Sequence, residues 1–275
     1  MSPVVGTLDT LIPEIEEVYR DPLPDYRGRA ISKEHVLNYL LSSYHRTQEI
    51  VGIIRELDRD KRILDLGIGY GFYDIILKTA YGFDICGMEI PANIPAYCRL
   101  PQAHGIPIIP GELSATRRCP LSDESFDVVI LAEVFEHLRV SPLRALVEIR
   151  RILRPEGLLL LTTPNIARLS NILSLLRAQN IIESLPDDDA GLNHITDNMT
   201  HIREYTMQEL TVLMTRAGYK IIKSVHSSAP DRAAPRERYG WRKRLARLMS
   251  KPALILVPSF RSLLVVVGRK VEEAS

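Results

Sequence analysis

Short apolar runs alternate with longer stretches of helical periodicity through the middle of the chain. Each run has the length expected for a strand that is buried on both faces, and turns or helical patterns separate the runs. Strands that alternate with helices predict a parallel sheet with crossover helices, in which ligands bind at the carboxyl ends of the strands. The strands we expect are residues 62–66, 83–88, 106–109, 126–132 and 157–162.

The two ends of the chain depart from this alternating pattern. Residues 1–60 are predicted to form a helical cap, because apolar side chains recur there at helical spacing. Residues 61–275 are predicted to hold the sheet and its helices. Near the end of the chain, the elements we expect are a helix over 206–217 and strands over 219–225 and 263–267.

A glycine-rich turn follows the first strand. Gly67, Gly69 and Gly71 let the backbone bend sharply and approach a ligand closely before a helix begins. Asp65 stands just ahead of the turn, where a carboxylate repels a pyrophosphate but suits a ligand that carries an ammonium group. Glu89 follows about twenty residues later, at the end of the next strand, where it can accept both hydroxyls of a ribose. This pattern favours a nucleoside without phosphates over an ordinary α/β turn with a surface glutamate.

The turn and its neighbours resemble the class I S-adenosylmethionine-dependent methyltransferases, whose first motif is similar to LDLGIGYG at residues 64–71. The resemblance continues over residues 60–165, through SDESFDVVILAEVFEHL at 122–138 and RRILRPEGLLLLTTPN at 150–165. It implies a doubly wound, Rossmann-like, seven-stranded and mostly parallel sheet whose last two strands pair antiparallel at the edge. It also implies S-adenosylmethionine as the cofactor.

The same resemblance implies a role for each residue of the cofactor pocket. Asp65 and the three glycines of the turn hold the methionine part, Glu89 holds the ribose, and Glu133 lines the methionine end. Glu112 and Leu113 follow the third strand, where the family commonly has an Asp that takes the adenine amino group. Here that position is Glu.

The candidate catalytic residues come just after the fourth strand. Glu133, Glu136 and His137 are spaced so that one helical turn brings them together. In one interpretation, His137 is a general base for an acceptor hydroxyl, with a carboxylate such as Glu136 holding its tautomer. In the other, these three residues bind a divalent cation such as Mg²⁺, which lowers the pKa of the hydroxyl directly. His201 resembles the later histidine that completes a magnesium site in small-RNA 2′-O-methyltransferases, and both interpretations stay open.

Residues 165–204 form an insertion after the fifth strand and are predicted to be a substrate lid. Their sequence is similar to a segment of polysaccharide-cluster and glycolipid methyltransferases in which TPN-x-x-R-L-x-N precedes HxREYT. This similarity implies a saccharide or glycolipid hydroxyl as acceptor, and a role in polysaccharide biosynthesis. Methylation of a quinone or of an RNA 2′-hydroxyl, and a cofactor-binding scaffold without catalysis, are the alternatives. The matching residues are Pro164, Asn165, Arg168, Leu169 and Asn171.

The net charge limits the possible binding partners, and the cysteine content indicates the cellular compartment. A formal net charge of +1 over 275 residues gives no overall attraction for nucleic acid. The three cysteines lack metal-ligand spacing and are odd in number, which favours a reducing compartment. Because no signal-type apolar core follows the first residues, we expect a cytoplasmic protein.

A basic and apolar insertion at residues 228–261 separates the last two strands. Arg and Lys surround Trp241, and the apolar run ALILVPSF that follows is too short to span a bilayer. The segment can lie on an anionic membrane surface and bring the enzyme to a lipid-linked saccharide. The alternative is a solvated helix that buries its leucine face on the domain.

Overall fold

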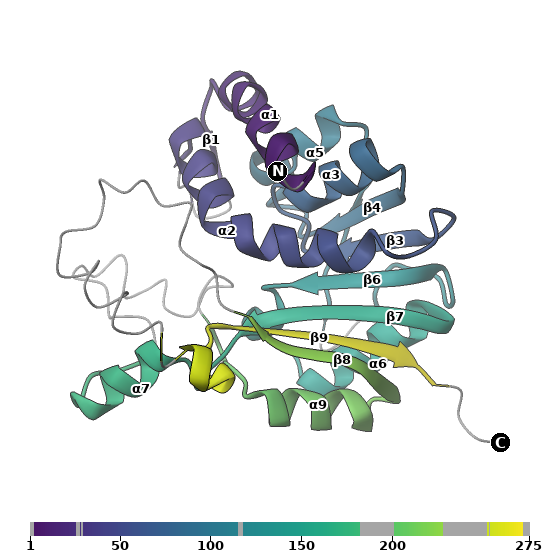
Figure 1. Cartoon of the computed structure of the whole chain (residues 1–275). Coiled ribbons are helices and arrows are strands. Elements are labelled where there is room, and N and C mark those ends of the chain that lie inside the picture. Colours follow the sequence, from purple (N-terminus) through teal and green to yellow (C-terminus); the bar gives the residue numbers. More distant parts are fainter. Residues whose placement is uncertain are drawn as a thin grey trace.

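The computed structural model contains a seven-stranded sheet with the order β5-β4-β3-β6-β7-β9-β8 (Figure 1). It describes residues 3–25, 28, 30–114, 118–181, 201–227, 252 and 254–271. The strands of this sheet run parallel except β9, which is antiparallel to both of its neighbours. The predicted fold class is therefore confirmed. The strands are β3 (Arg62–Leu66), β4 (Asp84–Glu89), β5 (Ile108–Pro110), β6 (Phe126–Ala132), β7 (Leu153–Pro164), β8 (Tyr219–Ser227) and β9 (Leu263–Lys270).

Helices cover both faces of the sheet, because alternate side chains of each central strand point in opposite directions. Ile63 and Val128 join one hydrophobic cluster with helices α1 (Pro3–Val18), α2 (Lys33–Ile54) and α3 (Phe72–Tyr81). Leu64 and Val129 join a second cluster with α6 (Pro142–Ile152) and α9 (Met207–Arg216). The remaining elements are β1 (Leu23–Pro24), β2 (Ala30–Ile31), α4 (Ile94–Tyr97), α5 (Arg99–Ala103), η1 (Phe135–His137), α7 (Leu169–Leu176) and η3 (Pro258–Phe260).

The apolar runs identified every parallel strand of the sheet up to β7. The first and fourth runs coincide with β3 and β6. The fifth run lies inside the longer β7, which begins directly at the end of α6. The third run was placed two residues early, since pairing with β4 begins only at Ile108. Strand identity thus followed from hydrophobicity, whereas strand ends depended on pairing.

The N-terminal helices share a hydrophobic core with α3 rather than forming one of their own. The hydroxyl of Ser32 caps α2 by accepting a hydrogen bond from the backbone N–H of His35 at 3.3 Å. One stripe of α2, including Val36, Leu40 and Ile50, is buried. Other side chains of α2, including those of Tyr39 and Arg46, line the cavity at the carboxyl ends of the strands.

The C-terminal part adds the antiparallel edge that the resemblance implied. Strands β8 and β9 pair from Tyr219 with Lys270 to Ser227 with Leu263. Helix α9 begins with a capping box of Thr206 and Glu209, and Gly218 just beyond it has a φ of +85°. Parts of the two expected insertions, namely residues 182–200 and 228–251, lie outside the residues that the structure describes. Within the part of the chain that the structure describes, no helix combines the length and apolar character needed to cross a bilayer.

Candidate active site

A cavity of about 670 Å³ lies where the carboxyl ends of β3, β4 and β6 meet α2. Its wall includes the glycine turn, Glu89, the segment 111–114 after β5, the segment 132–140 after β6, and His201. This is the position at which a doubly wound sheet binds its ligands. The cavity therefore brings together every element that the sequence assigned to the cofactor or the chemistry, apart from Asp65.

The glycine turn has the backbone conformation that its sequence requires. Gly67 and Gly69 have φ values of +81° and +51°, a region that residues with a Cβ rarely adopt. A Cβ on Gly67 would lie 2.6 Å from a methyl carbon of Val134, so this glycine also permits close approach of the loop after β6. At Gly69 a Cβ would meet nothing closer than 4.0 Å, which leaves the backbone open to a ligand.

Glu89 is held rigidly at the end of β4. Its Oε2 accepts a hydrogen bond from the backbone N–H of Gly69 at 3.1 Å. Its Oε1 accepts from the backbone N–H of Ile90 at 3.0 Å and from the side-chain amide of Asn93 at 3.1 Å. The carboxylate is thus tied to the glycine turn in the cavity wall. Its lone pairs beyond these three bonds can accept the hydroxyls of a ribose.

Asp65 is placed differently from the sequence-based expectation. Leu64 and Leu66 face the α6–α9 side, so the alternating pattern turns Asp65 toward α3, where it is fully buried and outside the cavity wall. Its Oδ2 accepts a hydrogen bond from the hydroxyl of Tyr73 at 2.6 Å, and burial raises its pKa to about 7. Asp65 therefore does not reach the cavity itself, and its hydrogen-bond partner Tyr73 lines the cavity in its place. Its contact with an ammonium group remains a prediction.

Helix α2 contributes a charged residue that sequence reasoning missed. The guanidinium of Arg46 lies 3.5 Å from Oε2 of Glu133, and its Nη2 donates a hydrogen bond to the hydroxyl of Tyr39 at 2.9 Å. Oε1 of Glu133 accepts from the hydroxyl of Thr162 at 3.2 Å. A guanidinium beside a carboxylate is the chemical complement of an α-amino acid, which carries one carboxylate and one ammonium group.

The spacing of polar residues on α2 would have revealed this side of the cavity. His35, Tyr39, Ser43 and Arg46 follow one another at intervals of four, four and three residues, which places them on one helix face. All four line the cavity. A polar stripe of this kind on a helix that caps a ligand site is a signal that can be read from the sequence.

Gly111, Glu112 and Leu113 line the cavity after β5, as the adenine assignment requires. The backbone N–H of Gly111 donates to the carbonyl of Glu89 at 3.0 Å, which ties this segment to β4. The side chain of Glu112 is exposed, whereas that of Leu113 is half-buried and packs against the α6–α9 cluster. Their contact with adenine remains a prediction.

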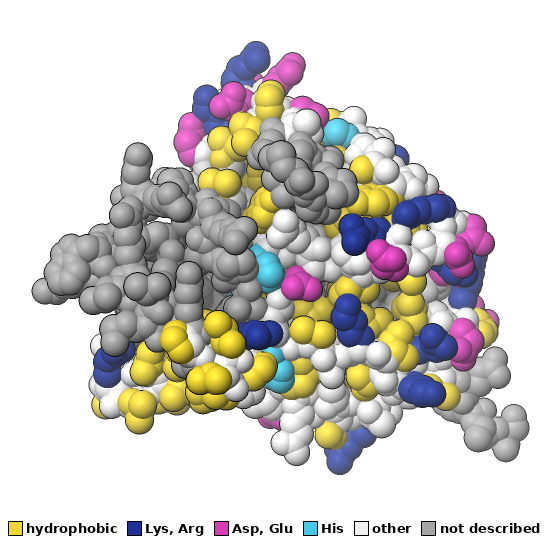
Figure 2. Space-filling view, in the orientation of Figure 1, with side chains coloured by type: hydrophobic (Ala, Val, Ile, Leu, Met, Phe, Trp, Pro, Cys, Tyr) yellow, Lys and Arg dark blue, Asp and Glu magenta, His cyan; other side chains and the backbone are white. Residues whose placement is uncertain are grey.

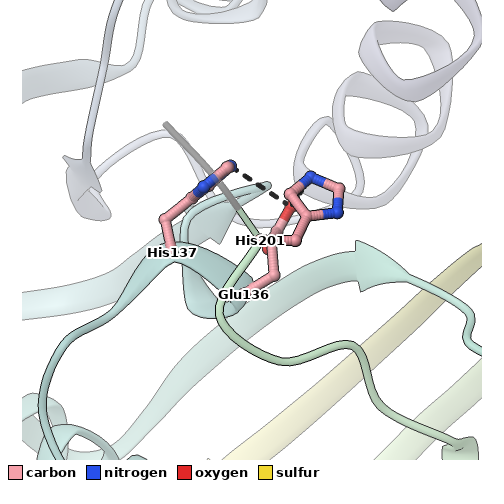
Figure 3. Close-up of side chains that lie close together, drawn as sticks. All are labelled: Glu136, His137 and His201. Carbon is pink, nitrogen blue, oxygen red and sulfur yellow. Dashed lines mark ion pairs between the residues drawn. The ribbon is translucent and has the colours of Figure 1, made fainter. Parts of the chain in front are cut away.

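Glu136, His137 and His201 lie close together in the same cavity wall (Figure 3). Oε1 of Glu136 lies 3.9 Å from Nε2 of His137 and 4.0 Å from Nε2 of His201. The two imidazole rings meet edge to face, with centroids 4.8 Å apart. Glu136 is 1% exposed, and its Oε2 accepts a hydrogen bond from the hydroxyl of Thr163 at 3.0 Å. Burial, followed by the charge of Glu133, holds the pKa of Glu136 well above its usual range.

Three of the four residues expected to bind a cation come together in the structure. Glu136, His137 and His201 offer ligand atoms within 4.8 Å of one another, but Glu133 does not belong to this group. The reason is local: Glu133 has a φ of +56°, and Phe135–His137 is a 3₁₀ turn, so the spacing argument for an α-helix does not apply. Mg²⁺ prefers oxygen ligands at about 2.1 Å. One carboxylate and two imidazoles at this separation fit Mg²⁺ poorly.

Known proteins resemble this chain in sequence and in fold. A family model described as a methyltransferase domain matches residues 34–224. The ubiquinone biosynthesis O-methyltransferase of Roseobacter denitrificans is 31% identical over 162 residues, which cover 55% of this chain and 62% of that protein. The phthiotriol/phenolphthiotriol dimycocerosates methyltransferase 1 of Mycobacterium ulcerans is 26% identical over 189 residues, covering 68% and 58%. The chain therefore spans about three fifths of the length of these relatives.

Solved structures share the fold at lower sequence identity. A putative methyltransferase of Haloferax volcanii, solved in complex with the Trm112 methyltransferase activator, superposes with a TM-score of 0.58. It is 18% identical, and the match covers 86% of this chain and 94% of that one. A phosphoethanolamine N-methyltransferase 2 of Haemonchus contortus, solved with S-adenosyl-L-methionine, has a TM-score of 0.54 at 12% identity, covering 96% and 57%. At these identities the similarity shows the fold alone.

Proposed function

Because the chain belongs to the family that this methyltransferase domain defines, we propose that it is an S-adenosylmethionine-dependent O-methyltransferase acting on a saccharide or glycolipid hydroxyl. The observation that carries this proposal is the chemistry of the cavity wall. The wall includes the carboxyl groups of Glu89, Glu112 and Glu133, and it also includes the cluster of Glu136 with two imidazoles. Acidic side chains suit a cofactor with ammonium and sulfonium groups, and an imidazole suits proton removal from a hydroxyl.

The residues of the cavity wall would hold the cofactor at several points. S-adenosylmethionine, when bound, supplies a methyl group on a positively charged sulfur. Glu89 accepts the ribose hydroxyls, while Glu112 and Leu113 contact the adenine. Arg46 and Glu133 complement the carboxylate and ammonium of the methionine part, and Asp65 supports this part of the pocket by accepting the hydrogen bond of Tyr73. Together these contacts orient the cofactor relative to the imidazoles, which is the main source of rate in a transfer between two bound groups.

The cluster of Glu136, His137 and His201 supplies the base. An imidazole accepts the hydroxyl proton as the acceptor oxygen bonds to the methyl carbon, and the carboxyl group of Glu136 lies within 4.0 Å of both imidazoles. His137 is the base that the sequence predicted. In the cation alternative, Glu136, His137 and His201 would bind the ion without Glu133. Chelation with EDTA tests this alternative.

Two observations support a saccharide or lipid-borne acceptor over other hydroxyls. The segment whose sequence predicts a glycolipid or saccharide acceptor, Pro164 to Asn171, lies next to this cluster, since Thr163 hydrogen bonds Glu136. One relative is named for phthiotriol and phenolphthiotriol dimycocerosates. A quinone-type acceptor is the second candidate, because another relative is named for ubiquinone biosynthesis. An RNA 2′-hydroxyl has less support, since the net charge is only +1.

A screen with S-adenosylmethionine labelled in its methyl group tests the proposed acceptor class. We expect label in glycolipid extracts or nucleotide sugars, and we expect that mild base, which cleaves methyl esters but not methyl ethers, leaves it in place. Catechols, quinols and short RNAs are included as the other acceptor classes. Label that enters only RNA or only catechols contradicts the saccharide proposal. An absence of label in every class, together with intact cofactor binding, supports the scaffold alternative.

We also propose that the enzyme contacts an anionic membrane surface near residues 254–257. Hydrophobic side chains gather over α7 and this segment (Figure 2). Leu175 and Leu176 are 57% and 78% exposed, and Ile255 and Leu256 are 71% and 79% exposed. The side-chain amide of Asn165 donates to the carbonyls of Ser259 and Arg261, which joins the two segments. Such a patch suits the interfacial region of a bilayer, while the basic residues of 232–251 lie outside the described residues.

Co-sedimentation with phosphatidylglycerol vesicles checks this membrane contact. We expect binding at low salt that weakens as ionic strength rises, because basic side chains are attracted to anionic headgroups. Replacing Leu176 and Leu256 by Glu should weaken binding, whereas Val147→Glu on α6, which changes a 49% exposed valine elsewhere, should not. Equal binding to neutral vesicles, or no binding at low salt, contradicts the proposal.

A further inference from the structure

Glu204 is held in place by the segment that follows β7. Its Oε2 accepts a hydrogen bond from Nη1 of Arg168 at 2.5 Å and a longer one from the side-chain amide of Asn171 at 3.3 Å. The carboxylate is largely buried, with 11% of its side chain exposed. Burial alone would raise the pKa of Glu204, but the hydrogen bonds from His201 and Arg168 outweigh it and lower the pKa to about 2. Glu204 is therefore a carboxylate, which can only accept hydrogen bonds.

The other oxygen of Glu204 faces His201. Oε1 lies 2.9 Å from Nδ1 of His201, so Nδ1 must carry the proton of this hydrogen bond. In the neutral imidazole the remaining nitrogen, Nε2, then has a free lone pair. This nitrogen lies 4.0 Å from Oε1 of Glu136, and His201 lines the cavity. The unprotonated nitrogen is therefore at the site of the proposed chemistry.

Backbone hydrogen bonds also hold the segment that carries His201 beside Glu136. The N–H groups of Ile202 and Arg203 donate to the carbonyl oxygen of Glu136 at 2.8 and 3.3 Å. The N–H of Ile166 donates to the carbonyl of Tyr205 at 3.0 Å, which joins the segment after β7 to the segment that carries His201. The segment that follows His201 is thus tied both to Glu136 and to the segment after β7, although His201 lies 64 positions after His137 in the sequence.

We propose that Glu204 is a positioning residue that makes His201 the proton acceptor for the substrate hydroxyl, with Arg168 and Asn171 fixing the orientation of Glu204. The inference rests on the proposed O-methyl transfer. As the acceptor oxygen bonds to the methyl carbon, the bond from carbon to sulfur breaks and sulfur keeps the electron pair. The hydroxyl proton moves to Nε2 of His201, and the resulting imidazolium is stabilised by Glu204 at Nδ1. The sequence resemblance links Arg168 and Asn171 to a sugar acceptor. In this proposal they act by holding Glu204, which in turn sets the tautomer of His201.

Glu204→Gln tests this assignment because it changes the tautomer while keeping the shape. Arg168 and Asn171 both donate to the Oε2 position, so the amide oxygen of the glutamine must take that place. Its NH₂ group then faces Nδ1 of His201, which must become the acceptor, and Nε2 carries the proton. We expect kcat to fall by about 10²- to 10⁴-fold, the range for a base held in the wrong tautomer. Glu204→Ala leaves either tautomer accessible, so its loss should be smaller, about 10- to 100-fold.

Nitrogen-15 NMR of the histidine rings measures the tautomer without any acceptor substrate. The spectrum is recorded for the full chain at a pH where the rings are neutral, and His201→Asn identifies the signals of His201 among those of seven histidines. We expect the proton on Nδ1 in the native protein and on Nε2 in Glu204→Gln. This result can be obtained even if the acceptor class has been misjudged, so the two proposals can fail separately.

The matched control is Glu209→Gln on the same segment. Glu209 closes the capping box of α9 and pairs with Arg203, and it does not line the cavity. It should leave both the His201 tautomer and kcat unchanged, and S-adenosylhomocysteine should bind all three glutamate variants as it binds the native protein. A native His201 protonated on Nε2, an unchanged tautomer in Glu204→Gln, or a greater loss in Glu204→Ala than in Glu204→Gln overturns the proposal.

Discussion

Replacing His201 by alanine should lower kcat by about 10²- to 10⁴-fold, the contribution of a positioned general base, and leave cofactor affinity unchanged. The reason is that we assign Nε2 of His201 to the acceptor hydroxyl, whereas we assign Glu89, Glu112 and Glu133 to the cofactor. His137→Ala should reduce kcat as well, because its ring packs against that of His201 at 4.8 Å. Rates are measured with the acceptor found in the labelled screen, at saturating S-adenosylmethionine.

Chelation in the same assay distinguishes a general-base mechanism from a cation-dependent mechanism. If proton transfer to an imidazole is the mechanism, EDTA should leave the rate unchanged, since the donor set of the cluster fits Mg²⁺ poorly. His104→Ala is the control for histidine loss, because His104 pairs with Glu14 at 2.6 Å and does not line the cavity. Activity that disappears with EDTA and returns with magnesium or manganese contradicts the base mechanism and restores the cation site.

The parts of the fold that follow from local sequence could be predicted. The strand β3, the glycine turn and α3 depend on a short apolar run and on glycines that alone adopt positive φ, so neighbouring residues determine them. Glu89 follows from the same logic, because the length of one strand–helix–strand unit places it at the end of β4. These features recur in many sequences of this fold and need no knowledge of distant contacts.

The parts of the site that depend on tertiary structure could not be predicted. A helical geometry was assumed for Glu133 to His137, but packing places Glu133 at a φ of +56° and turns its carboxylate toward Arg46 and Thr162. Arg168 reaches Glu204, the hydrogen-bond partner of His201, across 36 residues of sequence. Such contacts depend on how separate segments pack, and hydrophobic periodicity carries no information about them.

Glu89→Ala should weaken the binding of S-adenosylhomocysteine by about 1.5 to 3 kcal/mol, the range for hydrogen bonds to a charged group, which corresponds to about 10- to 100-fold in Kd. The loss has two sources. The ribose loses its acceptor, and the backbone N–H of Gly69 and the amide of Asn93 lose the carboxylate that ties them together. Glu89→Gln, which keeps the shape and one acceptor oxygen, should lose less. Glu56→Ala, a change at an exposed surface glutamate, should have no effect.

Calorimetric titration with S-adenosylhomocysteine tests whether this cavity binds the nucleoside of S-adenosylmethionine through Glu89. We expect saturable binding to the native protein, with one ligand per chain, and weaker binding to Glu89→Ala by about 10- to 100-fold in Kd. Equal affinity in the two proteins, or tight binding of NAD with no response to S-adenosylhomocysteine, would contradict it.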